Sequence, residues 1–316
     1  MIKYLYTILT TKNPHLYYEK LLVEIIIILI VFFIYKTASK SKKIENFTQE
    51  KSFLLKKNEN IYDKFYVEIY DGITDRTKTC QRELYKIVKM TEADTRNSVI
   101  LDVGCGSGCV LNELTRAGFN AVGIEKSIEM IKYSESLYKD INIIEADVLD
   151  PIIFDNNVFS HILCTNFTIY ELKNKKQFFE NCYFWLNLNG YLIIHLVDRE
   201  KFSAKTFKDS IMDIHALYRS MQKPGDIKKT SAEFIDFVYD AVYEVDSKTN
   251  TVIFKEKFVD KETNHIRENE NTLYMEPIEE ILKIASNSGF IIKGKSNMKN
   301  CNGDQNQYLY VFEKTV

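Results

Sequence analysis

The stretch VILDVGCGSG (residues 99–108), followed by CVLNELTR (109–116), decides the expected fold. An apolar strand over 98–101 leads into a turn with three closely spaced glycines, and a helical pattern follows over 110–116. Glycine allows the backbone to approach a ligand without a Cβ clash, and the start of a helix offers free N–H groups. The order of strand, glycine turn and helix therefore predicts a nucleotide-type site on an α/β sheet.

The spacing of the glycines argues against a dinucleotide fingerprint, because Gly108 comes one residue too early for G-x-G-x-x-G and Cys109 stands in its place. The next strand, Asn120–Ile124, ends at Glu125. This is close to where α/β nucleotide sites hold an acid for ribose hydroxyls. The glycine spacing therefore weakens the interpretation as an NAD site, and the turn alone is only moderately specific.

Two further strands complete the pattern. The strand over 143–146 leads into Asp147 and Val148, and a carboxylate beside a hydrophobic residue there can bracket an adenine ring. The strand over 159–164 ends at Cys164 and opens into a polar and aromatic turn that reaches Tyr170.

In this order and at these gaps, VILDVGCGSG, VGIEKSIEMI, EADVLD and FSHILCTNFTIYEL resemble successive motifs of class I, S-adenosylmethionine (SAM) dependent methyltransferases. The resemblance implies SAM as the cofactor and a doubly wound Rossmann-like sheet of strand order 3-2-1-4-5-7-6. It assigns the glycines to the methionine moiety, the first acid to its amino group, the second to the ribose and the third to the adenine. The implied cofactor-binding residues are Asp102, Gly104, Gly106, Gly108, Glu125, Asp147, Val148 and Cys164.

The remaining elements fit this sheet. A helix over 175–186 and a strand over 191–197 form a further αβ unit, and a helix over 278–286 precedes two strands, at 291–294 and 307–313. The last two strands are expected to close the sheet as an antiparallel hairpin.

A long insertion, 199–276, separates these parts and is expected to cover the substrate. It is predicted to contain a helix over 204–221 and a small antiparallel sheet with strands at 234–245, 251–259 and 266–275. In the first strand Phe237 and Tyr239 share an aromatic face, whereas Asp236 and Asp240 share an acidic one. Two interpretations remain open. The strand has one face in the core and one face in solvent, or the sheet is a lid whose acids attract an amine.

The insertion also resembles that of sugar-amine N,N-dimethyltransferases and their type 11 relatives. In those enzymes an aromatic helix carries a Tyr eight residues before a Tyr-Asp pair, and Tyr62 precedes Tyr70-Asp71 at that spacing. The resemblance places Tyr62 over the methyl sulfonium, although simple packing of the helix is the alternative. Where those relatives carry a histidine, this chain has Tyr170 and Glu171, so Glu171 is expected to bind an ammonium or accept its proton.

The expected function is transfer of a methyl group from SAM to a small nitrogen or oxygen nucleophile. The alternatives are a lipid or membrane-protein methyltransferase and a SAM-binding scaffold without turnover. The net charge of -2 and the pI of about 6.3 give no overall attraction to nucleic acid. No metal-ligand cluster or disulfide framework is visible, and the six cysteines are interpreted as free thiols.

The N-terminal region is divided into a tail (1–20), a transmembrane anchor (21–38) and a linker (39–60), before the methyltransferase domain (61–316). Leu21–Tyr35 is almost wholly apolar, and a cleaved signal peptide or a core helix are the alternatives. Lysines that follow this run predict a single-pass membrane protein with its catalytic domain in the cytosol. The expected partners are a small-molecule substrate and the membrane, and a homodimer remains open.

Overall fold

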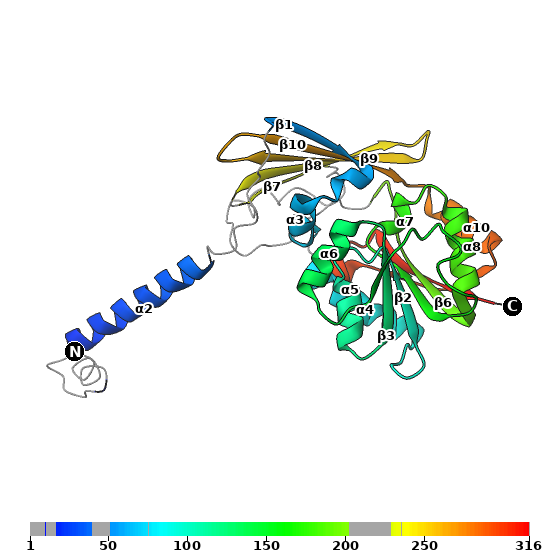
Figure 1. Ribbon diagram of the computed structural model, residues 1–316, viewed down its shortest axis with the longest axis horizontal. Helices are drawn as coiled ribbons and strands as arrows, with labels where there is room; N and C mark the ends of the chain where they lie inside the picture. The colour runs from blue at the N-terminus through cyan, green and yellow to red at the C-terminus, as the bar shows by residue number, and fades with distance from the viewer. Residues whose placement is uncertain are drawn as a thin grey trace. The chain divides into compact units, whose positions relative to one another are not determined.

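The computed structural model describes residue 10 and residues 17–39, 51–74, 76–201, 229–234 and 236–315 (Figure 1). The chain divides into two compact units, Met1–Asn46 and Phe47–Val316, which are described separately.

The first unit contains the helix α2 (Tyr17–Ser39). Among the described residues, no helix is long and apolar enough to span a bilayer. The transmembrane anchor predicted over 21–38 is therefore not supported by the structure. The mainly apolar run Leu21–Tyr35 is shorter than the about 20 residues that a bilayer core requires.

The second unit is built on a seven-stranded sheet of order β11-β12-β6-β5-β2-β3-β4. Its strands are β2 (Val99–Val103), β3 (Asn120–Glu125), β4 (Ile143–Glu145), β5 (Phe159–Cys164), β6 (Leu186–Val197), β11 (Phe290–Asn297) and β12 (Gln307–Lys314). Neighbours from β4 to β6 are parallel, whereas β12 runs antiparallel to both β6 and β11. Counted along the chain this is the order 3-2-1-4-5-7-6, which confirms the predicted sheet and its closing hairpin.

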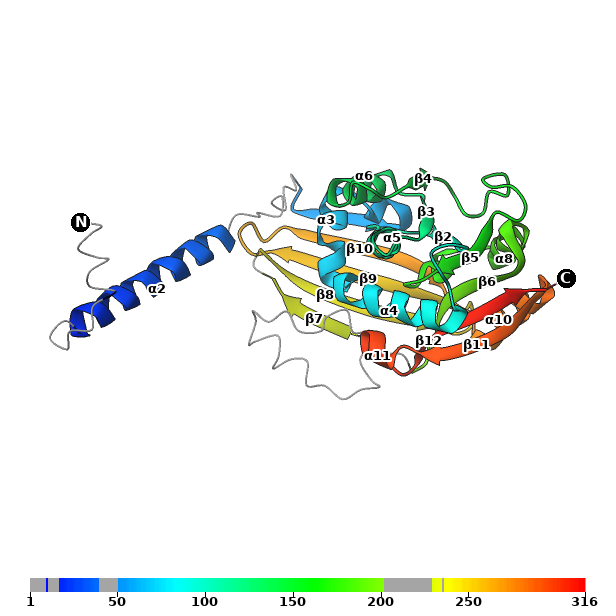
Figure 2. The same ribbon diagram turned by 90° about the horizontal axis from the view of Figure 1, so that it is seen from below.

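Helices cover both faces of this sheet (Figure 2). On one face α4 and α5 pack around Ile193 and Val311, and on the other α8 and α10 pack around Ile194 and Phe312. Successive strand residues point to opposite faces, so the apolar run of β6 serves both layers. In the part of this unit that the structure describes, the helices with six or more residues are α3 (Lys64–Thr74), α4 (Arg76–Thr91), α5 (Cys109–Arg116), α6 (Ile128–Leu137), α8 (Lys175–Trp185) and α10 (Ile278–Asn287).

A second sheet, which we call the lid sheet, has the order β1-β10-β9-β8-β7. Its strands are β1 (Phe53–Lys57), β7 (Lys229–Glu233), β8 (Phe237–Asp246), β9 (Thr251–Asp260) and β10 (Ile266–Tyr274). Phe237, Tyr239 and Phe258 pack on Ile69 and Ile73 of α3, so a hydrophobic cluster joins the lid sheet to this helix. The three predicted antiparallel strands of the insertion are confirmed.

One segment of this region differs from the prediction, and one predicted helix cannot be compared with the structure. Residues 53–57, assigned to the linker, form β1 and pair in parallel with β10. The pairing partner lies far away in sequence, so no local pattern indicates it. The helix predicted over 204–221 lies outside the described residues.

Cys80 of α4 and Cys109 at the start of α5 form a disulfide, with their Cα atoms 6.3 Å apart. The interpretation of all six cysteines as free thiols is therefore wrong for this pair. The two residues lie on different helices and meet because α4 packs against α5, which cysteine spacing alone does not reveal. Cys105, Cys164, Cys182 and Cys301 are free and buried.

Candidate active site

The glycine loop after β2 is held against the neighbouring strand. The N–H groups of Gly104 and Cys105 donate to the carbonyl oxygen of Ile124, at 2.8 and 3.1 Å. Gly104 has a φ of +62°, and a Cβ at this position would lie 2.5 Å from Cγ2 of Thr168. The left-handed conformation and the close approach both penalise a side chain, so position 104 requires glycine.

This loop borders a cleft of about 830 Å³, which we call the glycine-loop cleft. It lies at the carboxyl ends of the parallel strands β2 and β3, where α/β sheets bind their ligands. The predicted site residues that line it are Tyr62, Asp102, Gly104, Gly106, Glu125, Asp147, Val148 and Glu171. The structure thus brings residues from distant sequence motifs together around one cleft.

Three other predicted site residues do not line the cleft. A Cβ at Gly108 would meet Ser134 and Ile141, so this glycine permits close packing beside α6. Cys164 and Tyr170 are fully buried in the main core. The hydroxyl of Tyr170 accepts a hydrogen bond from the N–H of Val197 at 2.8 Å. The structure places all three residues in packed positions, and their predicted roles in cofactor binding and catalysis stay predictions.

The carboxylate of Glu125 connects the glycine loop to the turn after β3. Its Oε2 accepts the N–H of Gly106 at 2.9 Å, and its Oε1 accepts the N–H groups of Lys126 and Ser127 at 2.9 and 2.8 Å. Burial raises the pKa of Glu125, and the backbone donors partly offset that rise. The side chain of Lys126 also forms an ion pair with Asp147 at 3.1 Å, so the acids predicted for ribose and adenine lie in one connected network.

Asp102 lies beneath the same cleft and is only 2% exposed. Burial raises its pKa to about 7, although the nearby Arg76 guanidinium lowers it. Arg76 is engaged elsewhere, since its Nη1 donates to Oε2 of Glu83 at 2.8 Å. A cation bound next to Asp102 would favour the ionised carboxylate, as opposite charges do.

A second cavity, of about 140 Å³, lies between α3, α4 and the lid sheet, and we call it the aromatic cavity. Its aromatic lining includes Tyr62, Tyr66, Tyr70, Tyr239, Tyr243 and Phe254. It shares Tyr62, Tyr70, Arg76, Asn166, Glu171 and Asn271 with the glycine-loop cleft. The two spaces are therefore adjacent, with these shared residues at their junction.

At this junction the hydroxyl of Tyr62 donates to Oε1 of Glu171 at 2.7 Å, and Nδ2 of Asn271 approaches the same oxygen at 3.4 Å. The surrounding protein raises the pKa of Glu171 to about 7, chiefly by desolvation, while the Tyr62 hydrogen bond lowers it. The Glu171 side chain is open to both cavities. Because water in an empty cleft still reaches the carboxylate, we expect the full rise only when ligands fill the two spaces.

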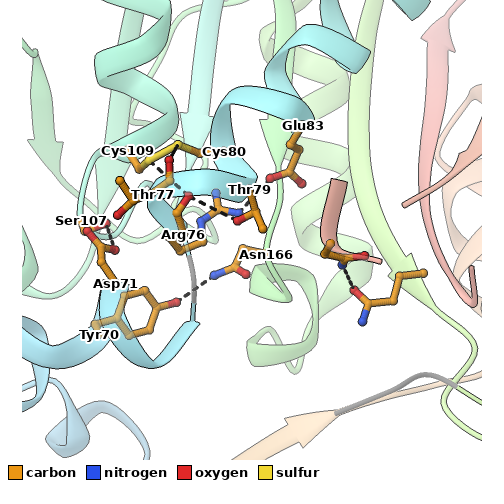
Figure 3. A network of polar contacts seen from close by, with 12 residues as sticks. Tyr70, Asp71, Arg76, Thr77, Thr79, Cys80, Glu83, Ser107, Cys109 and Asn166 are labelled. Atoms are coloured by element: carbon orange, nitrogen blue, oxygen red, sulfur yellow. Dashed lines mark hydrogen bonds and ion pairs between the residues drawn. A yellow bond between two sulfur atoms is a disulfide. The ribbon is translucent and has the colours of Figure 1, made fainter. Parts of the chain in front are cut away.

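Polar contacts from α3 hold the junction in place (Figure 3). The Tyr70 hydroxyl accepts a hydrogen bond from Nδ2 of Asn166 at 2.9 Å, and Asp71 accepts one from Ser107 at 2.6 Å. Asn166 and Phe167 have left-handed φ values of +50° and +70°. Such conformations are costly for a phenylalanine and are found where a site constrains the chain.

Arg267 of the lid sheet fixes the segment that carries Tyr62. Its guanidinium donates to both carboxylate oxygens of Asp63, at 2.8 and 2.9 Å, and to the carbonyl oxygen of Ile61, at 3.0 Å. Arg267 is 3% exposed and also stacks over Phe65. No motif in the sequence pointed to Arg267. The alternation of Arg267, Asn269 and Asn271 along β10 is the signal that could have revealed a polar face directed inward.

The acids predicted on the first strand of the insertion, Asp236 and Asp240, do not line the aromatic cavity. Asp240 lies on the face of β8 opposite to the buried Tyr239. The carboxylate that the lid sheet contributes to the aromatic cavity comes from β9 instead: Glu256 accepts the Tyr239 hydroxyl at 2.7 Å and Nδ2 of Asn269 at 3.1 Å. Among the described residues, no group of three or more His, Cys, Asp or Glu side chains is arranged to hold a metal ion.

A family model described as a methyltransferase domain matches residues 101–194. The ubiquinone biosynthesis O-methyltransferase of Rickettsia felis is 30% identical over 135 residues, which are 41% of this chain and 54% of that protein. The corresponding protein of Rickettsia canadensis is 28% identical over 123 residues. The chain thus spans about half the length of the curated relatives it matches.

Solved structures share the fold over most of this chain. The CcbJ methyltransferase from Streptomyces caelestis has a TM-score of 0.62 at 12% identity, covering 82% of this chain and 100% of its own. CalS10, an amino pentose methyltransferase from Micromonospora echinaspora, has a TM-score of 0.54 at 17% identity, covering 81% and 99%.

Proposed function

We propose that this chain, which carries a class I SAM-dependent methyltransferase domain, transfers a methyl group from SAM to a nitrogen atom of a small polar acceptor. One observation carries the proposal: the glycine-loop cleft and the aromatic cavity share Tyr62, Glu171 and their neighbours. A cofactor in the first and an acceptor in the second would meet at these residues.

The residues of the glycine-loop cleft fit SAM. The buried carboxylate of Asp102 suits the amino group of its methionine part, because a cation there favours the ionised acid. Glu125 lies beside the glycine loop as a buried acceptor for ribose hydroxyls. Asp147 and Val148 line the part of the cleft proposed for adenine. When bound, SAM supplies an electrophilic methyl group with a sulfonium leaving group.

Glu171 and Tyr62 are the residues proposed to act on the acceptor. The Glu171 carboxylate would take a proton from the acceptor ammonium and free the nitrogen lone pair for the methyl group that bound SAM would supply. Tyr62 holds Glu171 through its hydroxyl, and its ring lies at the junction. Most of the rate enhancement is expected from the fixed approach of the two reactants.

Nitrogen is favoured over an alcohol oxygen, because a carboxylate with a pKa of about 7 is too weak a base for an alkyl hydroxyl but suits an ammonium. A phenolic oxygen is the second candidate, since the Rickettsia relatives are named O-methyltransferases. A lipid or protein acceptor fits less well, because the cavity of about 140 Å³ is small. A SAM-binding scaffold without catalytic turnover does not account for the hydrogen bond between Tyr62 and Glu171.

The function is tested with purified protein, methyl-labelled SAM and fractionated cell extract. We expect label to enter a small polar amine. Label in a phenol supports the second candidate, and label in lipid or protein contradicts the proposal. Saturable SAM binding with no label in any fraction supports the scaffold.

Glu125→Gln is expected to weaken binding of S-adenosylhomocysteine about tenfold, because an amide cannot accept all three backbone N–H groups and leaves one buried donor without a partner. Isothermal titration calorimetry measures the affinity. Glu145→Gln is the matched control, since Glu145 pairs with Glu125 across the adjacent strand but is exposed and lines neither cavity. Equal affinities for both variants would refute the assigned role of Glu125.

Arg267→Lys is expected to lower kcat about tenfold with little change in S-adenosylhomocysteine affinity, because lysine cannot reproduce the planar fork that holds Ile61 and Asp63 around Tyr62. Initial rates of label transfer measure the effect. Arg116→Lys makes the same change at an exposed ion pair and should leave the rate unchanged. A full rate in Arg267→Lys would show that the clamp does not position Tyr62.

A membrane location with the catalytic part in the cytosol stays a prediction of the sequence. Fractionation of cells that express the full chain, compared with a chain lacking residues 21–38, tests it. Equal distribution of the two proteins would contradict the prediction.

A further inference from the structure

The aromatic cavity has a polar inner end, which we call the inner pocket and which the mechanism does not use. Its lining comes from α4, β6 and β12 and includes Glu83, His195 and Gln307. Glu83, His195 and Gln307 are only 1%, 3% and 5% exposed. Such strongly buried polar groups are expected to be fully hydrogen-bonded.

Glu83 departs from this expectation. Its Oε2 accepts the Arg76 guanidinium at 2.8 Å, and Figure 3 shows the two side chains turned toward each other. Its Oε1 is buried and has no hydrogen-bond partner among the residues that the structure describes. An unsatisfied carboxylate oxygen in a buried position raises the free energy of the folded protein. A group that enters the cavity and donates a hydrogen bond to this oxygen therefore gains more binding free energy than the same hydrogen bond would provide in water.

The charges around Glu83 indicate what kind of donor fits. Arg76 already neutralises Glu83, so a second cation would lack a counter-charge in a desolvated place. Burial lowers the pKa of His195, which keeps the imidazole neutral at physiological pH. The inner pocket therefore suits a neutral donor such as a hydroxyl group.

We propose that the inner pocket is a subsite for a hydroxyl group of the acceptor, bound by Oε1 of Glu83, while the acceptor's nucleophile lies at Tyr62 and Glu171. This inference rests on the proposed function and deepens it. The substrate class becomes an amino alcohol, with nitrogen and hydroxyl at opposite ends of a compact body, and simple aliphatic amines become poor acceptors.

A matched pair of probes tests the subsite. We would titrate trans-4-aminocyclohexanol and cyclohexylamine into the full protein saturated with S-adenosylhomocysteine and compare their affinities by calorimetry. The wild-type protein is expected to bind the amino alcohol at least about fivefold more tightly, as one hydrogen bond to a charged group provides. Equal affinities, tighter binding of cyclohexylamine, or binding of neither probe would overturn the subsite.

Glu83→Met is expected to reduce the preference to less than about twofold, because the acceptor oxygen is lost. This change leaves Arg76 without its partner and can impair folding, so Arg76→Met/Glu83→Met serves as the second variant, which removes both charges together. Glu113→Met, at an exposed pair with Arg116, is the matched control and should keep the full preference. An undiminished preference in either folded Glu83 variant would refute the assignment.

A crystal structure of the wild-type complex with S-adenosylhomocysteine and trans-4-aminocyclohexanol provides a test without variants. The hydroxyl oxygen is expected within about 3 Å of Oε1 of Glu83, and a hydroxyl directed to the lid sheet would contradict the subsite. If the protein binds S-adenosylhomocysteine and transfers label but does not discriminate between the probes, only the subsite fails. If it binds no S-adenosylhomocysteine, the proposed function fails as well.

Discussion

Gly104→Ala should weaken S-adenosylhomocysteine binding at least about 100-fold, the largest loss expected from any single methyl group in this protein. The added Cβ would lie 2.5 Å from Cγ2 of Thr168 and would force a non-glycine residue to adopt a φ of +62°. Thr168 lies at the start of α7 (Thr168–Glu171), so the added methyl group displaces either this side chain or the glycine loop. Calorimetric titration of the purified variant measures the loss.

Two further variants separate the steric cause from a general loss of stability. Gly72→Ala lies within α3, where a Cβ meets nothing within 4 Å, and is expected to stabilise the fold by about 1 kcal/mol without affecting binding. Gly104→Ala/Thr168→Ala removes both atoms nearest to the new Cβ and should restore part of the affinity. No recovery in this double variant would assign the defect to the backbone conformation alone.

Glu171→Gln should lower kcat about 100-fold, as expected for the loss of a general base, with S-adenosylhomocysteine affinity unchanged. When ligands fill both cavities, desolvation raises the pKa of Glu171 to about 7, so the carboxylate predominates only above that pH. The wild-type kcat should therefore rise with pH up to about 7 and then level off. In Glu171→Gln this rise should be absent, as rates of label transfer across the pH range would show.

Tyr62→Phe provides the companion test. The Tyr62 hydrogen bond lowers the pKa of Glu171, so its removal should move the inflection of the pH profile to higher pH. A merely structural role for Tyr62 predicts a lower rate with an unchanged inflection. An unaltered profile in both variants would exclude Glu171 as the titrating group.

The cofactor half of this protein was predictable because its determinants are local. Gly104 and Gly106 follow one strand, Glu125 ends the next, and the residue types required at these positions are few. Even here the sequence did not distinguish residues that line the cleft from residues that pack in the core. Gly108 faces α6, and Tyr170 turns into the core to meet Val197.

The acceptor half was predictable only in outline. The strands of the lid sheet were visible from their alternation, yet Glu256 and Arg267 depend on partners up to 206 residues away in sequence. The Cys80–Cys109 disulfide and the pairing of β1 with β10 are long-range in the same sense. Tertiary contacts of this kind leave no periodic pattern in a single sequence.

The structure of the full chain in complex with S-adenosylhomocysteine tests the central claim most directly. We predict that the adenine lies beside Asp147 and Val148, that the ribose lies at Glu125, and that the sulfur faces the junction of Tyr62 and Glu171. A sulfur atom that points away from the aromatic cavity would contradict the account, because no acceptor in that cavity would then reach the methyl group.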